Sequence, residues 1–415
     1  MKFEKSQEWL ERAKKVIPYP YTQTFSKGPA MYVQGQSPIF ASHGAGCYLY
    51  DVDNNRYIDM VMGLMPLILG YVDILKENGM PLFSLPTRYE VELSELLCEL
   101  IPCAEMVRFG KNGSDTTTAA VRLARAITGR DYILACGYHG WHDWYIGKTG
   151  RNKGVPEDTK RMTKFFEYND LCMLRQYEYL RGNVACIIME PMHFEMPKPG
   201  FLEGIREYCT KNKVPLIFDE IITGFRFGLG GAQEFLGITP DIACFGKAMA
   251  NGWPISAVVG RKELMEEFGN VHFSITFGGE VNSIRAALKT IEYLRKNEVI
   301  QFIRTRGSLL KLGVHTLIDK HGLSEWLQIE GTEYWSRFRF KDYGIQSLFS
   351  QECIKRGLLI LDSHNLSYSH TDSVIQTTLD IYNEVFEIVG EAIRTGTVEK
   401  VIKGIPIQQK TVRGK

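Results

Sequence analysis

The sequence lacks the features that mark several common classes of protein. Its 49 Lys+Arg nearly balance its 48 Asp+Glu, so a net charge of +1 gives no reason to expect nucleic acid or an anionic membrane as a partner. The nine cysteines include no CxxC pair and complete no zinc pattern, which favours reduced thiols in a cytoplasmic protein and no metal site. No P-loop is present, and no GxGxxG follows a first strand. The most apolar stretch, MVMGLMPLILGYV, is too short to span a membrane and contains Gly and Pro.

The sequence is rich in short apolar runs that alternate with helical segments. We expect strands at 106–110, 132–136, 185–190, 215–220, 242–247 and 256–260. Strands that are apolar throughout and alternate with helices predict an α/β fold, with a mostly parallel central sheet covered by helices on both faces. In such sheets ligands bind outside the carboxyl ends of the strands, so the polar residues at those ends are the candidates for function.

The chain of 415 residues is long enough for a large domain and a smaller one. Residues 1–58 read as a helix, an irregular arm and a hairpin that joins a small α+β domain. Residues 59–300 carry the predicted parallel sheet, and residues 301–415 mix helices with short strands. We therefore expect a large domain at 59–300 and a small domain built from the N-terminal arm and the C-terminal part.

Two candidate ligand-binding segments follow the first predicted strands. Gly113 and Ser114 open a helix after strand 106–110, and a glycine turn at a helix start offers backbone N–H groups to a phosphate. Taken alone, such a segment is more often an ordinary N-cap and turn. Tyr138 and His139 follow strand 132–136, where an aromatic ring could stack on a planar cofactor or simply pack against its neighbours.

The later strands end in charged residues. Asp219 and Glu220 end strand 215–220, and one carboxylate at this place could hold a protonated ring nitrogen, cap a helix or form a structural ion pair. Glu190 ends the parallel strand before it and is a candidate second-layer carboxylate. Lys247 ends strand 242–247, where partial burial would make its amine nucleophilic, as Schiff-base chemistry requires.

These separate signals gain weight because they occur in order along one predicted sheet. A phosphate cradle, a stacking aromatic, a carboxylate for a ring nitrogen and an imine-forming lysine together describe a site for pyridoxal 5′-phosphate (PLP). The sequence thus predicts an enzyme that uses PLP, with Lys247 and one of the two carboxylates Asp219 and Glu220 as its central residues.

The stretch from Leu216 to Met265, with its Asp-Glu, Thr-Gly-Phe and Gly-Lys elements, closely resembles the class-III aminotransferases of PLP fold type I. Within that class it is most similar to the glutamate-1-semialdehyde 2,1-aminomutases. The segments LYDVDNNRYIDMV, PLILGY, EVELSELLCELIP, VRLARAITGRD and YHGWHD support the resemblance.

The resemblance implies roles for the matching residues. Lys247 would form the internal aldimine and move the proton, and Asp219 would pair with the pyridinium nitrogen. Gly113 and Ser114 would bind the phosphate, and Tyr138 would stack on the ring. His139 and Glu190 lie among the residues that match the cofactor site. Thr276 matches a residue that completes the phosphate site of a neighbouring subunit, which implies a homodimer with active sites at its interface.

The segments that contact substrate in the aminomutases differ here. The arm PYPYTQTFSKG lacks the arginine that helps to hold the substrate carboxylate, and IGKTGRNKGVPED replaces a longer gating loop. The segments EPMHFEMPKPG and DSHNLSYSHTD also depart from the family pattern. A missing arginine removes a bidentate anchor for a carboxylate, so we expect a neutral or hydroxylated carbonyl acceptor such as a keto-sugar. The candidate substrate residues, which ordinary loop polarity also explains, are Gln23, His193, His364 and Asn365.

Several activities are compatible with this sequence. We expect an aminotransferase that moves an amino group from a donor amine to a carbonyl acceptor. An aminomutase, which isomerises one substrate without a separate donor, is the alternative. The same scaffold also hosts racemases, decarboxylases and catalytically silent PLP-binding relatives, although Lys247 and Asp219 argue against a silent one.

Overall fold

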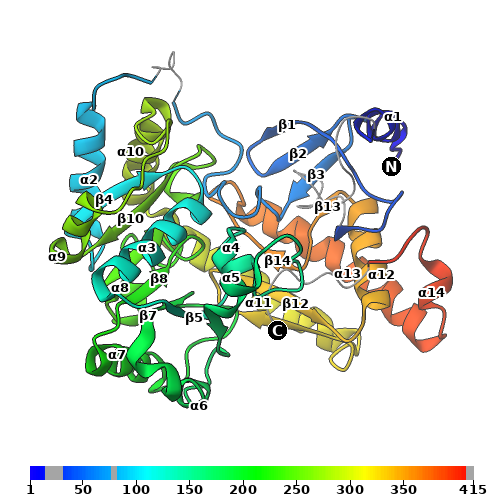
Figure 1. The fold of residues 1–415 in the computed structure, drawn as a ribbon. Coiled ribbons are helices and arrows are strands. Elements are labelled where there is room, and N and C mark those ends of the chain that lie inside the picture. Colours follow the sequence, from blue (N-terminus) through cyan, green and yellow to red (C-terminus); the bar gives the residue numbers. More distant parts are fainter. Residues whose placement is uncertain (15–30, 76–81, 408–415) are drawn as a thin grey trace. The chain divides into compact units, whose positions relative to one another are not determined.

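The computed structural model describes residues 1–14, 31–75 and 82–407 of the chain (Figure 1). The chain divides into two compact units, which we describe separately. The first unit combines Met1–Val72 with Gln301–Lys410, and the second contains Asp73–Ile300. Residues 59–72, which the sequence analysis assigns to the large domain, therefore group with the first unit.

The second unit is built on a seven-stranded sheet with the order β4-β10-β9-β8-β7-β5-β6. Five of these strands, β6, β5, β7, β8 and β9, run parallel, and β10 pairs antiparallel with both β9 and β4. The strands are β4 (Met106–Gly110), β5 (Tyr132–Cys136), β6 (Thr163–Phe165), β7 (Val184–Met189), β8 (Leu216–Asp219), β9 (Ile242–Phe245) and β10 (Ser256–Gly260). The six predicted strands and the α/β class are confirmed; the three-residue β6 was not predicted.

Helices cover this sheet. Figure 1 shows α3 lying across the strands, and α3 contacts β4, β7, β9 and β10. One face of α3 carries small and apolar residues, including Ala120, Leu123 and Ala124, which are fully buried against the sheet. The helices are α2 (Arg88–Leu100), α3 (Gly113–Thr128), α4 (Asp143–Ile146), α5 (Glu157–Arg161), α6 (Cys172–Arg175), α7 (Phe201–Asn212), α8 (Ala232–Leu236), α9 (Lys262–Met265) and α10 (Val281–Lys296), with 3-10 helices η3 (Glu178–Asn183), η4 (Lys247–Ala250) and η5 (Glu266–Gly269).

The first unit contains two small sheets. One has the order β1-β2-β3-β13 and includes the predicted hairpin, in which β2 and β3 pair antiparallel; the other has the order β11-β12-β14. Their strands are β1 (Ala41–Ala45), β2 (Tyr48–Asp51), β3 (Arg56–Asp59), β11 (Leu327–Gly331), β12 (Ser336–Phe340), β13 (Leu358–Leu359) and β14 (Ser363–His364). The helices are α1 (Glu4–Ala13), α11 (Val299–Lys320), which begins at the end of the second unit, α12 (Tyr343–Lys355), α13 (Asp372–Arg394) and α14 (Val398–Val401).

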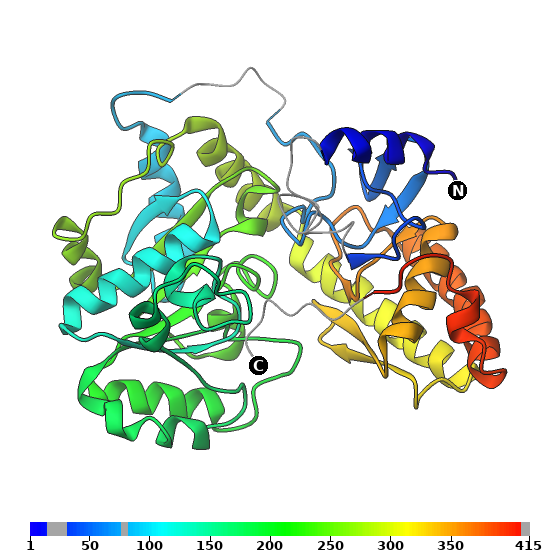
Figure 2. The same cartoon turned by 45° about the vertical axis from the view of Figure 1, so that its right-hand side comes forward.

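Packing inside the first unit joins segments that are far apart in the sequence. Asp53, in the turn between β2 and β3, accepts hydrogen bonds from the backbone N–H groups of Lys5 and Ser6 at the start of α1. Figure 2 shows α1 beside these blue strands. Phe338 on β12 packs against Phe349 on α12 and Tyr382 on α13, which forms an aromatic core. Across the described ranges, no helix is both long enough and apolar enough to cross a membrane.

Candidate active site at the carboxyl edge of the sheet

The strand register of the second unit brings the predicted site segments together. Cys136 at the end of β5 pairs with Met189 on β7, which pairs in turn with Phe218 on β8. Asp219, the last residue of β8, pairs with Cys244 on β9. The loops that begin at residues 137, 190, 220 and 246 therefore leave the sheet at one edge, which is the expected place for a ligand site in a parallel sheet.

Asp219 and His139 form a buried pair at this edge. Nδ1 of His139 lies 2.8 Å from Oδ2 of Asp219, and the two residues are 2% and 3% exposed. Oδ1 of Asp219 accepts a second hydrogen bond, 3.1 Å long, from the backbone N–H of Ile221. A carboxylate has about four acceptor sites, so Asp219 keeps capacity for a further donor. Within the described ranges, no Lys or Arg forms an ion pair with this buried carboxylate.

The His139 ring is held by two aromatic neighbours. It stacks on Trp144 with ring centroids 6.2 Å apart and meets Tyr145 edge-on at 5.3 Å. Because Asp219 can only accept, Nδ1 of His139 carries the proton that joins them. Nε2 is buried and has no hydrogen-bond partner in the described part of the chain. The ring is thus positioned to orient the carboxylate of Asp219.

Glu220, the neighbour of Asp219, is used differently. It is completely buried and accepts hydrogen bonds from the backbone N–H groups of Ala232, at 2.8 Å, and Gln233, at 2.9 Å, and from the Thr223 hydroxyl. Burial raises the pKa of Glu220, and these hydrogen bonds act in the opposite direction. Glu220 uses its acceptor sites to hold the loop that follows β8, so it has a structural role. Asp219 is the carboxylate that remains a candidate for binding a ligand.

Lys247 follows β9 after Phe245 and Gly246 and opens η4. It is half-buried, and its φ of 43° lies in the left-handed region, which is costly for a residue with a Cβ. Strained backbone of this kind persists where the surrounding structure imposes it, and it concentrates at functional sites. The three residues that follow it are buried: Ala248, Met249 and Ala250. Packing therefore holds the chain in place directly after Lys247.

The segment predicted to bind phosphate lies at the N-terminus of α3. Gly113 and Ser114 lie in its first turn, which is spanned by a capping box between Asn112 and Asp115. Trp141 donates its backbone N–H to Oγ of Ser114 at 3.2 Å, and Oγ1 of Thr117 donates to the carbonyl of His139 at 2.8 Å. The helix start is therefore tied to the loop that carries His139. Thr117 could not be singled out from the sequence, because a threonine inside a helix has no distinguishing local pattern.

Close backbone approach explains two glycines in the His139 loop. Gly137 and Gly140 have φ values of 106° and 104°, and a Cβ at these positions would overlap the side chains of Glu190 and Ser114, respectively. Glu190 also accepts a 2.9 Å hydrogen bond from the backbone N–H of Tyr138. The Tyr138 ring is half-buried and meets Tyr145 edge-on at 5.6 Å. Tyr138, His139, Glu190 and Ser114 therefore lie together at this edge of the sheet.

Thr276 lies in an exposed turn of the same unit. The turn is closed by a 3.0 Å hydrogen bond from the Gly278 N–H to the Ile275 carbonyl. Phe277 beside it is 60% exposed, which is high for an aromatic side chain. The exposure of both residues is compatible with a contact to another subunit.

The four candidate substrate residues are not brought together within one unit. Gln23 lies outside the described residues. His193 follows β7 in the second unit and is close to Glu190. His364 belongs to the first unit, where Nδ1 is 2.9 Å from the Ser336 hydroxyl and Nε2 is 2.8 Å from the Tyr382 hydroxyl. Both ring nitrogens of His364 are thus engaged, and burial lowers its pKa to about 3, with His370 adding to the shift.

Asn365 is 4% exposed and joins β14 to the segment after β3. Its backbone N–H donates to the Met60 carbonyl at 3.0 Å, and its Nδ2 donates to the Val61 carbonyl at 3.1 Å. These contacts describe a residue that supports the backbone of the first unit.

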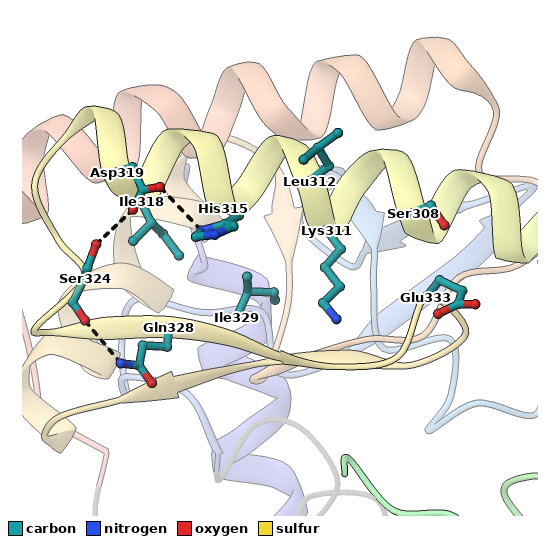
Figure 3. A pocket seen from close by; sticks show the side chains of 10 residues that line it. All are labelled: Ser308, Lys311, Leu312, His315, Ile318, Asp319, Ser324, Gln328, Ile329 and Glu333. Atoms are coloured by element: carbon teal, nitrogen blue, oxygen red, sulfur yellow. Dashed lines mark hydrogen bonds and ion pairs between the residues drawn. The ribbon is translucent and has the colours of Figure 1, made fainter. Parts of the chain in front are cut away.

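The first unit has a pocket of about 580 Å³, which is lined by residues between 308 and 333. Figure 3 shows its lining, from α11, β11 and the segments flanking that strand: Ser308, Lys311, Leu312, His315, Ile318, Asp319, Ser324, Gln328, Ile329 and Glu333. Lys311 donates to the Gly331 carbonyl, and His315 lies 3.7 Å from Asp319. The lining includes none of the predicted site residues.

Comparisons with known proteins agree with the geometry. Residues 31–383 match the family model described as aminotransferase class-III. The chain is 35% identical to a 3-aminobutyryl-CoA aminotransferase of Cloacimonas acidaminovorans, with 92% of this chain and 97% of the relative covered. It is 34% identical to a glutamate-1-semialdehyde 2,1-aminomutase of Methanocaldococcus jannaschii, with 93% and 99% covered.

Solved structures show the same architecture. The PLP internal aldimine form of the FumI protein of Sphingopyxis sp. MTA144 aligns with a TM-score of 0.85 and 26% identity, over 94% of this chain and 98% of that one. An omega-transaminase of Sphaerobacter thermophilus aligns with a TM-score of 0.84 and 25% identity, over 92% and 97%. The fold is therefore PLP fold type I, as predicted. With most of its length matched to the family model and to curated relatives, the chain belongs to the class-III aminotransferase family.

Proposed function

We propose that the protein is a PLP-dependent aminotransferase that moves an amino group from a donor amine to a carbonyl acceptor. The observation that carries the proposal is Asp219, a buried carboxylate held by His139 that keeps acceptor capacity and has no Lys or Arg ion pair within the described ranges. A protonated ring nitrogen is the kind of donor that would complete its environment. The residues present therefore fit PLP.

Each residue of the carboxyl edge has a task in this proposal. PLP, when bound, supplies an aldehyde that condenses with amines and a ring that withdraws electrons from the substrate. Asp219 holds the ring nitrogen in its protonated form, and His139 keeps that carboxylate in place. Lys247 supplies the amine that binds the cofactor and carries the transferred proton at Nζ.

The remaining cofactor residues bind and orient. The first turn of α3, with Gly113 and Ser114, offers backbone N–H groups and the positive end of the helix dipole to the phosphate. Tyr138 would stack on the ring, and Glu190 fixes the Tyr138 backbone by accepting its N–H. His364 is left out of the proposed site because both of its ring nitrogens are used within the first unit. Asn365 is left out because its N–H groups support the backbone of that unit, while its buried Oδ1 has no hydrogen-bond partner among the described residues.

We also propose that the enzyme works as a homodimer in which Thr276 completes the phosphate site of the partner subunit. The exposed turn at Thr276 and the exposed Phe277 support this arrangement. The proposal places the cofactor in a domain of residues 59–300 and assigns residues 1–58 and 301–415 to the small domain. The compact unit Asp73–Ile300 supports the core of that division.

The acceptor is proposed to be a neutral or hydroxylated carbonyl compound, such as a keto-sugar. The absence of an arginine from residues 18–28 supports a substrate other than a carboxylate. A cytoplasmic location is proposed as well, supported by the fact that all nine cysteines are free thiols.

The named relatives favour one alternative. The sequence identity of 34% to an aminomutase is nearly as high as the 35% identity to an aminotransferase, so isomerisation of glutamate 1-semialdehyde is the second candidate. An aminomutase turns over this compound without any added amino acid, whereas an aminotransferase needs a separate donor.

A spectroscopic experiment tests the proposal. Purified enzyme loaded with PLP is mixed with a panel of amino donors, and the cofactor absorption is followed until pyridoxamine phosphate forms. Carbonyl compounds are then added to restore the original spectrum. Formation of pyridoxamine phosphate with at least one donor supports transamination. Lack of conversion with every donor, together with turnover of glutamate 1-semialdehyde alone, would replace it by the aminomutase.

A further inference from the structure

Glu190 and His193 form a second carboxylate–imidazole pair at the carboxyl edge of the sheet. Oε2 of Glu190 lies 3.7 Å from Nε2 of His193, which is an ion-pair distance but too long for a direct hydrogen bond. The same oxygen accepts the backbone N–H of Tyr138 at 2.9 Å. Glu190 is 4% exposed, so this carboxylate is fixed between the Tyr138 loop and His193.

The loop that carries His193 is held by residues outside it. The hydroxyl of Tyr168 donates to the Pro191 carbonyl at 2.9 Å. Asn169 donates from Nδ2 to the Met196 carbonyl at 3.1 Å and accepts the backbone N–H of Lys198 at 2.7 Å. Hydrogen bonds at both ends of a short loop fix its backbone, so the position of the His193 side chain is set by the fold.

Aromatic contacts fix the His193 ring further. Its centroid lies 5.3 Å from that of Phe194, in an edge-on arrangement, and 6.2 Å from that of Tyr168. The His193 side chain nevertheless keeps 25% of its surface exposed. An imidazole that is oriented on one side and partly accessible on the other can hydrogen-bond to a ligand without a large loss of side-chain entropy.

We propose that His193 is a specificity-determining residue of the amine-transfer reaction, whose imidazole hydrogen-bonds to a neutral hydroxyl or keto oxygen of the amino acceptor. The inference rests on the proposed function. A chain of contacts links His193 to the reacting centre. His193 neighbours Glu190, Glu190 holds the backbone of Tyr138, and the next residue, His139, binds Asp219.

The charges of the loop favour a neutral oxygen over a carboxylate. Residues 190–196 contain two carboxylates, Glu190 and Glu195, and a single imidazole. A substrate carboxylate placed against His193 would lie close to the buried Glu190, and like charges at short range in a poorly solvated place repel strongly. A hydroxyl or keto oxygen accepts the same hydrogen bond without this repulsion.

Three matched acceptors test the inference. The pyridoxamine phosphate form of the enzyme is reacted with hydroxyacetone, butan-2-one and pyruvate, and kcat/KM is measured for each. We expect the wild type to prefer hydroxyacetone. His193→Ala should reduce the ratio of hydroxyacetone to butan-2-one about tenfold, as expected for the loss of one hydrogen bond. His193→Gln, which keeps a donor, should retain part of the ratio, and Glu190→Gln should raise the use of pyruvate relative to hydroxyacetone.

Controls separate recognition from damage to the site. His315→Ala, an exposed histidine on α11, should leave all ratios unchanged. PLP content and cofactor absorption of His193→Ala should match the wild type, because the variant removes a substrate contact only. An unchanged hydroxyacetone to butan-2-one ratio in His193→Ala, or a wild type that prefers pyruvate, would overturn the inference while leaving aminotransfer standing. A wild type that transfers no amine from any donor would instead overturn the proposed function and, with it, the role of His193.

Discussion

Nδ1 of His139 lies 2.8 Å from Oδ2 of Asp219, and both side chains are buried at the carboxyl edge of the parallel sheet. Asp219 ends β8, whereas His139 follows β5, so the pair joins strands that are separated by β7 in the sheet. Trp144 and Tyr145 hold the imidazole from its other sides. The imidazole therefore fixes the direction of the carboxylate, which is the property that pairing with a ring nitrogen requires.

This relationship makes His139 a positioning residue with a testable signature. His139→Ala should lower kcat for amine transfer about tenfold, since loss of one hydrogen bond to a charged group costs roughly 1.5 kcal/mol or more. The variant should also change the pH titration of the bound cofactor's absorption, because a mobile Asp219 holds the ring nitrogen less well. His139→Asn, whose amide can replace Nδ1–H, should restore both readouts in part. Equal spectra and rates in all three proteins would contradict the assignment.

Removal of the carboxylate charge should affect activity at Asp219 and stability at Glu220. Asp219→Asn should reduce amine transfer by about 10- to 100-fold and leave thermal stability close to the wild type, because a charge-assisted hydrogen bond of roughly 1.5–3 kcal/mol is lost at the ligand side. Glu220→Gln should instead destabilise the fold by about 1–3 kcal/mol, because its amide N–H₂ would face the donors of Thr223, Ala232 and Gln233. Denaturant titration and steady-state kinetics on both variants measure the contrast. Similar effects of the two substitutions would show that the separation of roles is wrong.

Acid should weaken the first unit through His364. Burial lowers its folded-state pKa to about 3, below the ordinary value of 6.5. As the pH falls below 6.5, His364 binds a proton in the unfolded chain but stays neutral in the folded chain. The contribution of His364 to the free energy of unfolding is therefore full above pH 6.5 and is lost progressively toward pH 3. The slope from this one group reaches about 1.4 kcal/mol per pH unit.

The measurement for His364 is a set of urea titrations at pH 7, 6 and 5. His364→Gln is less stable at neutral pH, but it should show a smaller loss between pH 7 and 5 than the wild type, because it removes the titrating group. Parallel pH dependence in the two proteins would exclude His364 as the source of the acid sensitivity.

The exposed turn at Thr276 should matter for assembly. Phe277→Asp places a charge on a side chain that is 60% exposed in the single chain, and it should shift the enzyme toward monomer and reduce PLP retention if the turn contacts a partner subunit. Leu312→Asp on α11, where the leucine is 67% exposed, is the matched control and should leave the assembly unchanged. Sedimentation velocity together with PLP content after gel filtration decides the question, and a fully dimeric, PLP-loaded Phe277→Asp enzyme would refute the proposed contact.

Strand-level features of the fold could be predicted because their signals are local. Apolar runs such as ACIIME and IACFGK lie between helical segments, and they became β7 and β9 almost within their predicted limits. The three-residue β6 carries too little pattern to be recognised, since Thr163–Phe165 contains one apolar residue. The end of the first unit at Val72 also has no composition change in the sequence to mark it.

Roles at the site depended on contacts that sequence cannot give. As a local pattern, Asp219 and Glu220 read as two equivalent carboxylates, and only the family resemblance assigned the ring nitrogen to Asp219. The hydrogen bonds that Glu220 receives from residues 223–233 give the physical difference between them. His364 looks like a polar loop residue, yet β14 pairs it with β12 and buries it beside Tyr382. His193 was placed among substrate candidates by its segment alone, and its pairing with Glu190 gives that expectation a specific chemical form.

The central claim is that Lys247, which begins η4 just after β9, is the residue that binds PLP covalently. Borohydride reduction of the PLP-loaded enzyme, followed by proteolysis and peptide mass spectrometry, tests it most directly. The account predicts one pyridoxyl group per chain, on Lys247, and none in a Lys247→Ala variant that retains the wild-type circular dichroism spectrum. A pyridoxyl group on another lysine of the wild type, or none at all, would contradict it.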